Sequence, residues 1–317
     1  MKKVFSLAVL VICFLLLLPL TALKQQSKAV SAISPKVTET AENETFRIYN
    51  TKTQETEKMD VKDYLFGVLA AEMPANYNAE ALKAQAVAAY TFALYRKNEN
   101  QNKTYDLTDN YLTDQSFITK AEARSRWGSK AEEYTEKFEN VLKETENYAI
   151  TYNNEPILAV YHAISYGKTE DAQNVWGKEY PYLKSAASYG DKLCNGYITT
   201  LSVNEEKFKE ILESQVSLNG EPQNYIGKTD RTNAGTVKTL EICNTEIRGS
   251  KLRELFSLRS SNFQIEYKDG NFNFTVYGYG HAVGLSQNGA EYMANEGSDF
   301  KQILNHYYKN CKIEKIN

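Results

Sequence analysis

The chain has 317 residues, of which 42% are hydrophobic and 24% are charged. This length and composition fit a globular protein with one large domain or two small ones. The net charge of −3 provides no basic surface for nucleic acid, so we expect no nucleic-acid partner.

An apolar segment at the N-terminus predicts a membrane anchor. Lys2 and Lys3 precede an apolar run from Val4 to Leu23, which as a helix would span roughly the 30 Å core of a bilayer. We therefore predict a transmembrane helix over residues 1–23, in contact with the membrane through residues 4–23. A cleaved signal peptide is the alternative, although its apolar core is usually shorter, about 7–15 residues. The two lysines predict a single-pass protein of the cell membrane, with a cytoplasmic N-terminus and an extracytoplasmic remainder.

A polar segment follows the predicted anchor. Residues 24–44 lack any apolar periodicity, which is typical of a tether. The folded domain is predicted over residues 45–317, beginning with a strand from Phe46 to Tyr49.

Two consecutive helices are predicted next. The first has one apolar stripe and is ended by Pro74, because a residue before proline is disfavoured in helical conformation; the stripe consists of Val61, Tyr64, Leu65, Val68 and Leu69. The second begins after the N-cap residue Asn78. Alanines lie on almost every face of it between Ala81 and Ala89, so we predict that this helix is central and closely packed.

The remaining elements mix helices and strands. We predict helices over residues 131–144, 205–214, 289–295 and 299–308, strands within 236–247 and 263–277, and a hairpin of strands 148–152 and 157–161. Residues 165–197 are predicted to form a functional loop. The fold class is therefore α+β, with the buried alanine-rich helix and its neighbouring helices packed on antiparallel strands.

Glu72 is the best candidate for chemistry. It lies three, four and seven residues after Leu69, Val68 and Leu65, and so continues the apolar stripe of its helix. Burial disfavours the ionised form of a carboxyl group, so its pKa should be raised, as a general acid requires. The alternative is that the helix frays before Pro74 and exposes Glu72 to solvent.

Histidines and cysteines leave three possibilities open. His162 follows an apolar strand, His281 lies among glycines, and His306 precedes two tyrosines. Cys194, Cys243 and Cys311 follow the predicted anchor. A Cys194–Cys243 disulfide, a metal site shared with a histidine, and three unconnected small apolar residues are all compatible with this spacing.

Three segments, in order, resemble the signature of the stage II sporulation protein D family, which includes amidase-enhancer proteins: residues 64–89, then 161–170, then 280–290. Residues 64–74 read YLFGVLAAEMP and residues 80–89 read EALKAQAVAA. Residues 161–170 read YHAISYGKTE, followed by Trp176, and residues 280–290 read GHAVGLSQNGA. The resemblance extends from about Phe46 to the end of the chain.

The resemblance implies a membrane-anchored lytic transglycosylase that degrades septal peptidoglycan during engulfment in sporulation. Such an enzyme cleaves the MurNAc–GlcNAc bond of glycan strands, leaves a 1,6-anhydro product, and requires no cofactor. The implied substrate is glycan whose stem peptides a partner cell-wall amidase has removed. Glu72 matches the family's catalytic glutamate, and the positions expected around the glycan cleft are Lys83, Gln85, His162, Ser165, Gly167, Thr169, His281, Ser286 and Gln287.

The number of carboxylates favours this chemistry over hydrolysis. Hydrolysis of a glycosidic bond usually needs two carboxylates across the scissile bond, and Glu170 and Asp171 lie in a loop whose position the sequence does not define. A transglycosylase needs one, because the sugar's own 6-hydroxyl is the nucleophile.

Departures from the family pattern concern the expected cleft contacts. Tyr90 stands where the family usually has arginine, Ala163 replaces a serine, and Ile164 and Tyr166 are bulky. Two alternatives remain at this point. One is a non-catalytic wall-binding module resembling the amidase enhancers. The other is a metallohydrolase with zinc held by His162, His281 and either Cys194 or Cys243.

Overall fold

The computed structural model describes residues 44–316. The predicted anchor and most of the predicted tether therefore lie outside the described residues. Within residues 44–316, no helix is both long enough and apolar enough to cross a membrane. The described chain is mixed α+β, as predicted.

The N-terminal elements lead into the two predicted helices. Strands β1 (Thr45–Tyr49) and β2 (Thr56–Asp60) form an antiparallel hairpin, and β3 (Leu107–Thr108) pairs with β1 in parallel. Helix α2 (Val61–Glu72) starts at Asp60, whose side chain accepts a hydrogen bond from the amide of Lys62. It ends at Glu72, because Met73 is already extended ahead of Pro74.

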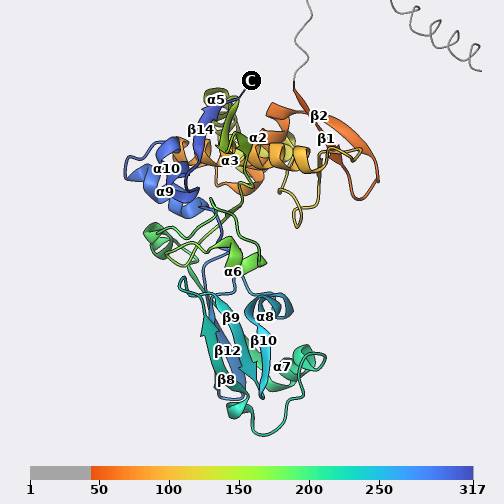
Figure 1. The fold of residues 1–317 in the computed structure, drawn as a ribbon, viewed down its shortest axis with the longest axis vertical. Helices are drawn as coiled ribbons and strands as arrows, with labels where there is room; N and C mark the ends of the chain where they lie inside the picture. Colours follow the sequence, from red (N-terminus) through yellow and green to blue (C-terminus); the bar gives the residue numbers. More distant parts are fainter. Residues whose placement is uncertain (1–43, 317) are drawn as a thin grey trace, which may run out of the picture. The chain divides into compact units, whose positions relative to one another are not determined.

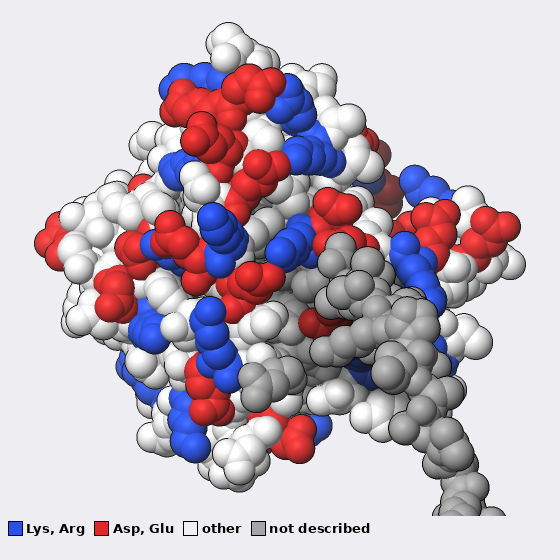
Figure 2. Space-filling model, turned by 90° about the horizontal axis from the view of Figure 1, so that it is seen from above, with Lys and Arg blue, Asp and Glu red and all other residues white. Residues whose placement is uncertain are grey.

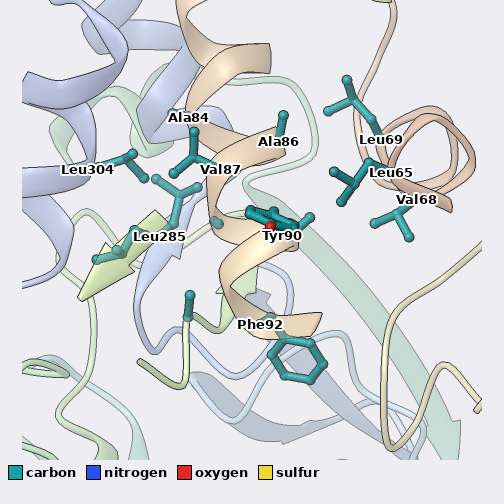
Figure 3. Close-up of a cluster of buried hydrophobic side chains, with 14 of the residues drawn as sticks. Leu65, Val68, Leu69, Ala84, Ala86, Val87, Tyr90, Phe92, Leu285 and Leu304 are labelled. Atoms are coloured by element: carbon teal, nitrogen blue, oxygen red, sulfur yellow. The ribbon is translucent and has the colours of Figure 1, made fainter. Parts of the chain in front are cut away.

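Helix α3 (Ala79–Glu99) is the centre of the larger core. The Asn78 side chain caps its first turn, and its buried residues run from Ala81 to Leu94 with few interruptions. Figure 1 shows α3 among α2, α5, α9 and α10. In the close-up, Leu285 and Leu304 approach α3 on the side of Val87, and the leucines of α2 lie on its other side (Figure 3). The alanines allow this close packing all round, which confirms the prediction of a central helix.

Two further helices cover this core. Helix α4 (Lys120–Trp127) starts with a capping box of Thr119 and Glu122, and α5 (Ala131–Glu144) has the predicted bounds. Gly67 of α2 lets the segment before α4 lie directly on α2, since a Cβ atom at position 67 would be 2.5 Å from the carbonyl oxygen of Ile118. This close approach places the segment that leads into α4 against the helix that ends at Glu72.

The predicted hairpin after α5 is only partly correct. Strand β4 (Tyr148–Tyr152) pairs with a very short β5 (Glu155–Pro156), and the Asn153–Asn154 turn has positive φ at both residues. The next strand, β6 (Tyr161–His162), instead pairs in parallel with β13 (Leu285–Ser286). The main partner of β4 is the C-terminal strand β14 (Lys312–Lys315). A pairing across about 160 residues leaves no local signal in the sequence.

The C-terminal helices agree with the sequence. Helix α9 (Gln287–Asn295) is capped by Ser286, and α10 (Phe300–Tyr307) by a capping box of Asp299 and Gln302. Gly297 has a φ of 94°, a left-handed conformation that suits glycine just after a helix end. The predicted loop over residues 165–197 contains a short α-helix, α6 (Ala172–Trp176), and a 3₁₀ helix over Tyr189–Leu193.

A second, smaller core is formed within residues 198–277. It contains α7 (Glu205–Leu212), α8 (Gly249–Leu255) and two three-stranded antiparallel sheets, of order β10-β9-β8 and β11-β12-β7. Their strands are β7 (Ile198–Asn204), β8 (Ile226–Arg231), β9 (Val237–Ile242), β10 (Thr245–Arg248), β11 (Phe263–Lys268) and β12 (Asn271–Tyr277). Each of the two predicted strand regions is thus a hairpin. Stacked aromatic rings fill the core, with Phe208 and Phe272 only 3.7 Å apart between ring centroids.

The charged surface agrees with the small net charge. On the face shown in Figure 2, basic and acidic side chains are interspersed rather than gathered into an area of one sign. That face offers no electrostatic footprint of the kind that binds nucleic acid.

Candidate functional site

A groove of about 570 Å³ opens beside the C-terminal end of α2. Its lining combines Glu72 with side chains of α3, of residues 111–115, of residues 158–161, of the segment around α6, and with His281. Trp176, Tyr180, Tyr111 and Tyr161 give it aromatic walls. Trp176 is 43% exposed and lies against the ring of His281, with centroids 5.3 Å apart. Flat aromatic faces beside hydrogen-bonding groups suit a sugar ligand.

Glu72 is held at this groove by two hydrogen bonds. The backbone amide of Ser116 donates to Oε1 at 3.1 Å, and the side-chain amide of Gln287 donates to Oε2 at 3.4 Å. The helix does not fray before Pro74, and Glu72 is its last residue. The alternative of a freely solvated Glu72 is therefore wrong.

The environment of Glu72 changes its pKa in the predicted direction. Burial raises the pKa above its usual value, and the hydrogen bonds from Ser116 and Gln287 offset only part of that effect. The prediction of a raised pKa is confirmed. A carboxyl group protonated closer to neutral pH is suited to general acid catalysis.

The second carboxylate of the groove is already neutralised. The Asp114 side chain is fully buried and lies 2.8 Å from Nε of Arg96. It also accepts hydrogen bonds from the amide and hydroxyl of Thr108. Asp114 therefore fixes the loop that carries Gln115 and Ser116, while Glu72 is the groove carboxylate that has no cationic partner within residues 44–316.

Gln287 and Gln85 support Glu72 from behind. Both are buried, and the Nε2 atom of Gln287 lies 3.5 Å from Oε1 of Gln85 as well as 3.4 Å from Glu72. Because β6 pairs with β13, Gln287 lies just beyond the strand beside Tyr161. The structure brings these two predicted site residues to Glu72.

The two predicted histidines also come together. His162 is buried, and its Nδ1 lies 3.1 Å from the carbonyl oxygen of Val283, so Nδ1 must carry the proton. His281 accepts a hydrogen bond from the amide of Val283 through Nδ1 and lines the groove. Burial lowers the pKa of His162 to about 4 and also lowers that of His281, so both rings are neutral near pH 7.

No metal site is formed by these histidines in the described part of the chain. Residues 44–316 contain no group of three His, Cys, Asp or Glu side chains placed to hold a metal ion. Cys194, Cys243 and Cys311 are free thiols there, so a Cys194–Cys243 disulfide is ruled out. The third histidine, His306, contacts the carbonyl oxygen of Ala187.

Ser165 and Ser286 are fully buried around Asp191, a residue that sequence analysis missed. The amide of Ser165 donates to Asp191 at 2.8 Å, and the Ser286 hydroxyl donates to it at 2.7 Å. Asp191 thus links the second and third family-like segments. Direct contact of either serine with a glycan stays an untested prediction, since both have 0% exposure.

Gly167, Thr169 and Lys83 lie outside the lining of the groove. Gly167 has a φ of 86° with the Lys192 side chain packed over it, and Thr169 accepts a hydrogen bond from the amide of Ala186. Lys83 forms ion pairs with Glu80 and Glu144 beside α5 and lines a different surface hollow. Their substrate contacts likewise stay predictions.

Glu170 and Tyr90, two further residues considered from the sequence, also lie outside the lining of the groove. Glu170 is buried and accepts a hydrogen bond from the Thr232 hydroxyl, so it is not a groove carboxylate. Tyr90 lines a separate cavity of about 120 Å³ and donates to Glu44. Its departure from the family pattern therefore lies away from Glu72.

Gln115, Ser116 and Tyr161 complete the Glu72 site but carried little sequence signal as site residues. The first two belong to an irregular loop, and Tyr161 begins the family-like segment of residues 161–170, in which the predicted site residues were His162, Ser165, Gly167 and Thr169. They are distinguished by the hydrogen bond from Ser116 to Glu72, the hydrogen bond from Gln115 to Tyr161, and the position of Gln115 and Tyr161 in the groove lining.

Comparison with known proteins identifies the family. Residues 49–152 match the family described as stage II sporulation protein. The chain is 34% identical to stage II sporulation protein D of Bacillus amyloliquefaciens and 35% identical to that of Bacillus subtilis. Each match covers 84% of this chain and 78% of the relative. The chain belongs to the stage II sporulation protein D family.

A more distant member of the comparison is the amidase enhancer of Bacillus subtilis. It is 25% identical over 77% of this chain, and the match covers 39% of that longer protein. The family match over residues 49–152 includes Glu72 and the two helices α2 and α3 that contribute to the groove.

Proposed function

We propose that this member of the stage II sporulation protein D family is a peptidoglycan lytic transglycosylase, with Glu72 as its acid and base. One observation carries the proposal: among the residues that the structure describes, Glu72 is the groove carboxylate with no cationic partner, and burial raises its pKa. The aromatic walls of the groove support a carbohydrate as the ligand.

The proposed reaction requires one carboxyl group in two successive roles. Protonated Glu72 gives its proton to the glycosidic oxygen between MurNAc and GlcNAc, and the bond from that oxygen to the anomeric carbon breaks. The 6-hydroxyl of the muramic acid then attacks the anomeric carbon, and the Glu72 carboxylate takes up its proton. The product is a 1,6-anhydro ring, the glutamic acid is regenerated, and no water is consumed.

The pairing of Asp114 supports this route over hydrolysis. Either hydrolytic mechanism needs a second carboxylate as base or nucleophile. Asp114 is buried against Arg96 and accepts two hydrogen bonds from Thr108, so it is not available to activate water.

The family and the apolar N-terminal segment support a proposal for the wider setting. We place the enzyme at the cell membrane, anchored through residues 4–23, with its groove outside the cytoplasm. The substrate is glycan of the septal wall during engulfment, stripped of stem peptides by a partner amidase. The mechanism requires no metal or other cofactor.

The test compares the purified full-length chain with Glu72→Gln on peptide-free and peptide-bearing glycan strands, with and without a chelator. We expect 1,6-anhydro-muramic products from the wild type by mass spectrometry, unaffected by chelator. Loss of the acid should lower the rate by a factor of about 10² to 10⁴. Wild-type activity should fall as pH rises through the raised pKa of Glu72, because only the protonated form is the acid. Glu80→Gln, on α3 and paired with Lys83, is the matched control and should retain activity.

A non-catalytic wall-binding module is the second candidate, favoured by the similarity to an amidase enhancer. It predicts that wild type and Glu72→Gln bind glycan equally and that neither yields any product. Activity abolished by the chelator would instead favour the metallohydrolase alternative.

A further inference from the structure

A chain of three hydrogen-bonded side chains ends in the Glu72 groove. The hydroxyl of Tyr64, on α2, donates to Oε1 of Gln115 at 3.0 Å. The Nε2 atom of Gln115 donates to the hydroxyl oxygen of Tyr161 at 2.8 Å. Tyr64 and Gln115 are buried, while Tyr161 is half-buried and lines the groove together with Glu72.

The burial of Tyr64 fixes the direction of this chain. Each hydroxyl has one proton, and among the described residues Gln115 is the hydrogen-bond partner of the Tyr64 hydroxyl. If the Gln115 amide were reversed, Nε2 would donate to Tyr64, and the Tyr64 proton would be buried without an acceptor. Because an unsatisfied buried donor is costly, the amide must present its oxygen to Tyr64 and its nitrogen to Tyr161.

This direction leaves the Tyr161 proton unused. Its hydroxyl oxygen accepts from Gln115, so its own proton is free to be donated into the groove. Burial and the nearby Glu72 charge raise the pKa of Tyr161 well above its usual value, so the hydroxyl keeps this proton. Gln115 is followed by Ser116, which holds Glu72, so one loop positions both groups.

We propose that Tyr161 is a further catalytic residue, whose hydroxyl donates a hydrogen bond to an oxygen of the sugar bound against Glu72. Tyr64 and Gln115 are the positioning residues that keep its proton directed at the sugar. The inference rests on the proposed function, since it assigns the ligand of the groove as a glycan.

The first measurement is the kinetics of Tyr161→Phe, with kcat and KM determined separately. Removing one neutral hydrogen bond should lower kcat/KM by about tenfold. Tyr267→Phe is the matched control, because Tyr267 lies on β11 of the smaller core and outside the lining of the groove, and its kcat/KM should not change. A wild-type kcat/KM in Tyr161→Phe would overturn the inference.

The sharper test uses Tyr64→Phe, because Tyr64 lies outside the lining of the groove. Without the Tyr64 proton, Oε1 of Gln115 is free to turn toward Tyr161 and accept its proton. We therefore expect kcat/KM to fall about threefold, a partial loss of a neutral hydrogen bond. The double variant should be no worse than Tyr161→Phe alone, because both changes act on the same proton. Independent, multiplicative effects would overturn the role of Tyr64.

Failure of the proposed function gives a different result. If the wild type binds glycan strands but yields no anhydro product, the proposed transglycosylase activity is rejected. The contact of Tyr161 with the sugar can then still be tested by measuring binding affinity. Tyr161→Phe should then raise the Kd for peptide-free strands, again by about tenfold, whereas Tyr267→Phe, outside the groove lining, should leave it unchanged. An unaltered Kd in Tyr161→Phe would reject the contact as well.

Discussion

The two cores of this protein have different architectures and different tasks. The larger core surrounds α3 and consists mainly of helices with short strands, whereas the core of residues 198–277 consists of two small sheets and two helices. Every residue that lines the Glu72 groove lies outside residues 198–277. The comparison shows that the site is built at element ends of one core and that the other contributes no lining residue.

The smaller core nevertheless contacts the segments that carry the site. Thr232 donates to Glu170, in the segment that begins with Tyr161 and His162. Ser260 pairs with Gly280, the residue before His281. Residues 198–277 also separate the second and third family-like segments along the chain. We infer that this core supports their positions without taking part in the chemistry.

The largest expected effect that tests this division comes from two matched phenylalanines. Phe272 and Phe138 are both fully buried, one in each core. Alanine at either position should cost about 3–5 kcal/mol of unfolding free energy. Only Phe138→Ala should also lower glycan turnover in the folded protein, because Phe138 packs against Phe66 of α2, the helix of Glu72.

Denaturant unfolding and turnover at a temperature where both variants are folded would measure these effects. An equal loss of turnover in Phe272→Ala would break the division, since it would show that the smaller core acts directly on the groove.

A smaller effect is expected from pH, through a histidine of the larger core. The unfolded chain takes up a proton on His162 near pH 6.5, whereas burial keeps the folded ring neutral until about pH 4. Stability should therefore fall as pH decreases from about 6.5 to 4, by about 3 kcal/mol from this residue. His281, whose pKa is also lowered, adds a change in the same direction.

The variant His162→Asn separates the two contributions. Asparagine keeps a donor for the Val283 carbonyl but does not titrate, so the slope of unfolding free energy against pH should become shallower. An unchanged slope in urea titrations between pH 7 and 4 would contradict the neutral, buried state of His162.

The smallest effect is expected at Lys83. Its ion pairs with Glu80 and Glu144 are partly exposed, and such pairs contribute about 0–1 kcal/mol. Because Lys83 lies outside the groove lining, Lys83→Met should leave kcat and KM unchanged. A raised KM would instead support the expectation from the family resemblance, which is still untested, that Lys83 contacts the glycan.

Local sequence patterns were enough to predict most helices and to single out Glu72. Periodicity and caps predicted α2, α3, α5, α9 and α10 because helix hydrogen bonds and N-caps join residues close in sequence. The same stripe that defined α2 predicted an inward-facing Glu72 with a raised pKa, and Glu72 is partly buried with its pKa raised by desolvation.

Other features were decided only by tertiary structure. The pairing of β4 with β14, the parallel pairing of β6 with β13, and the second core depend on contacts between distant residues. Asp191, Gln115 and Tyr161 acquire their roles in the same way. A buried polar group needs a hydrogen-bond partner, and the sequence names the group without naming its partner. Sequence periodicity was therefore enough to single out Glu72, whereas the groups that surround it could be known only after folding had brought distant segments together.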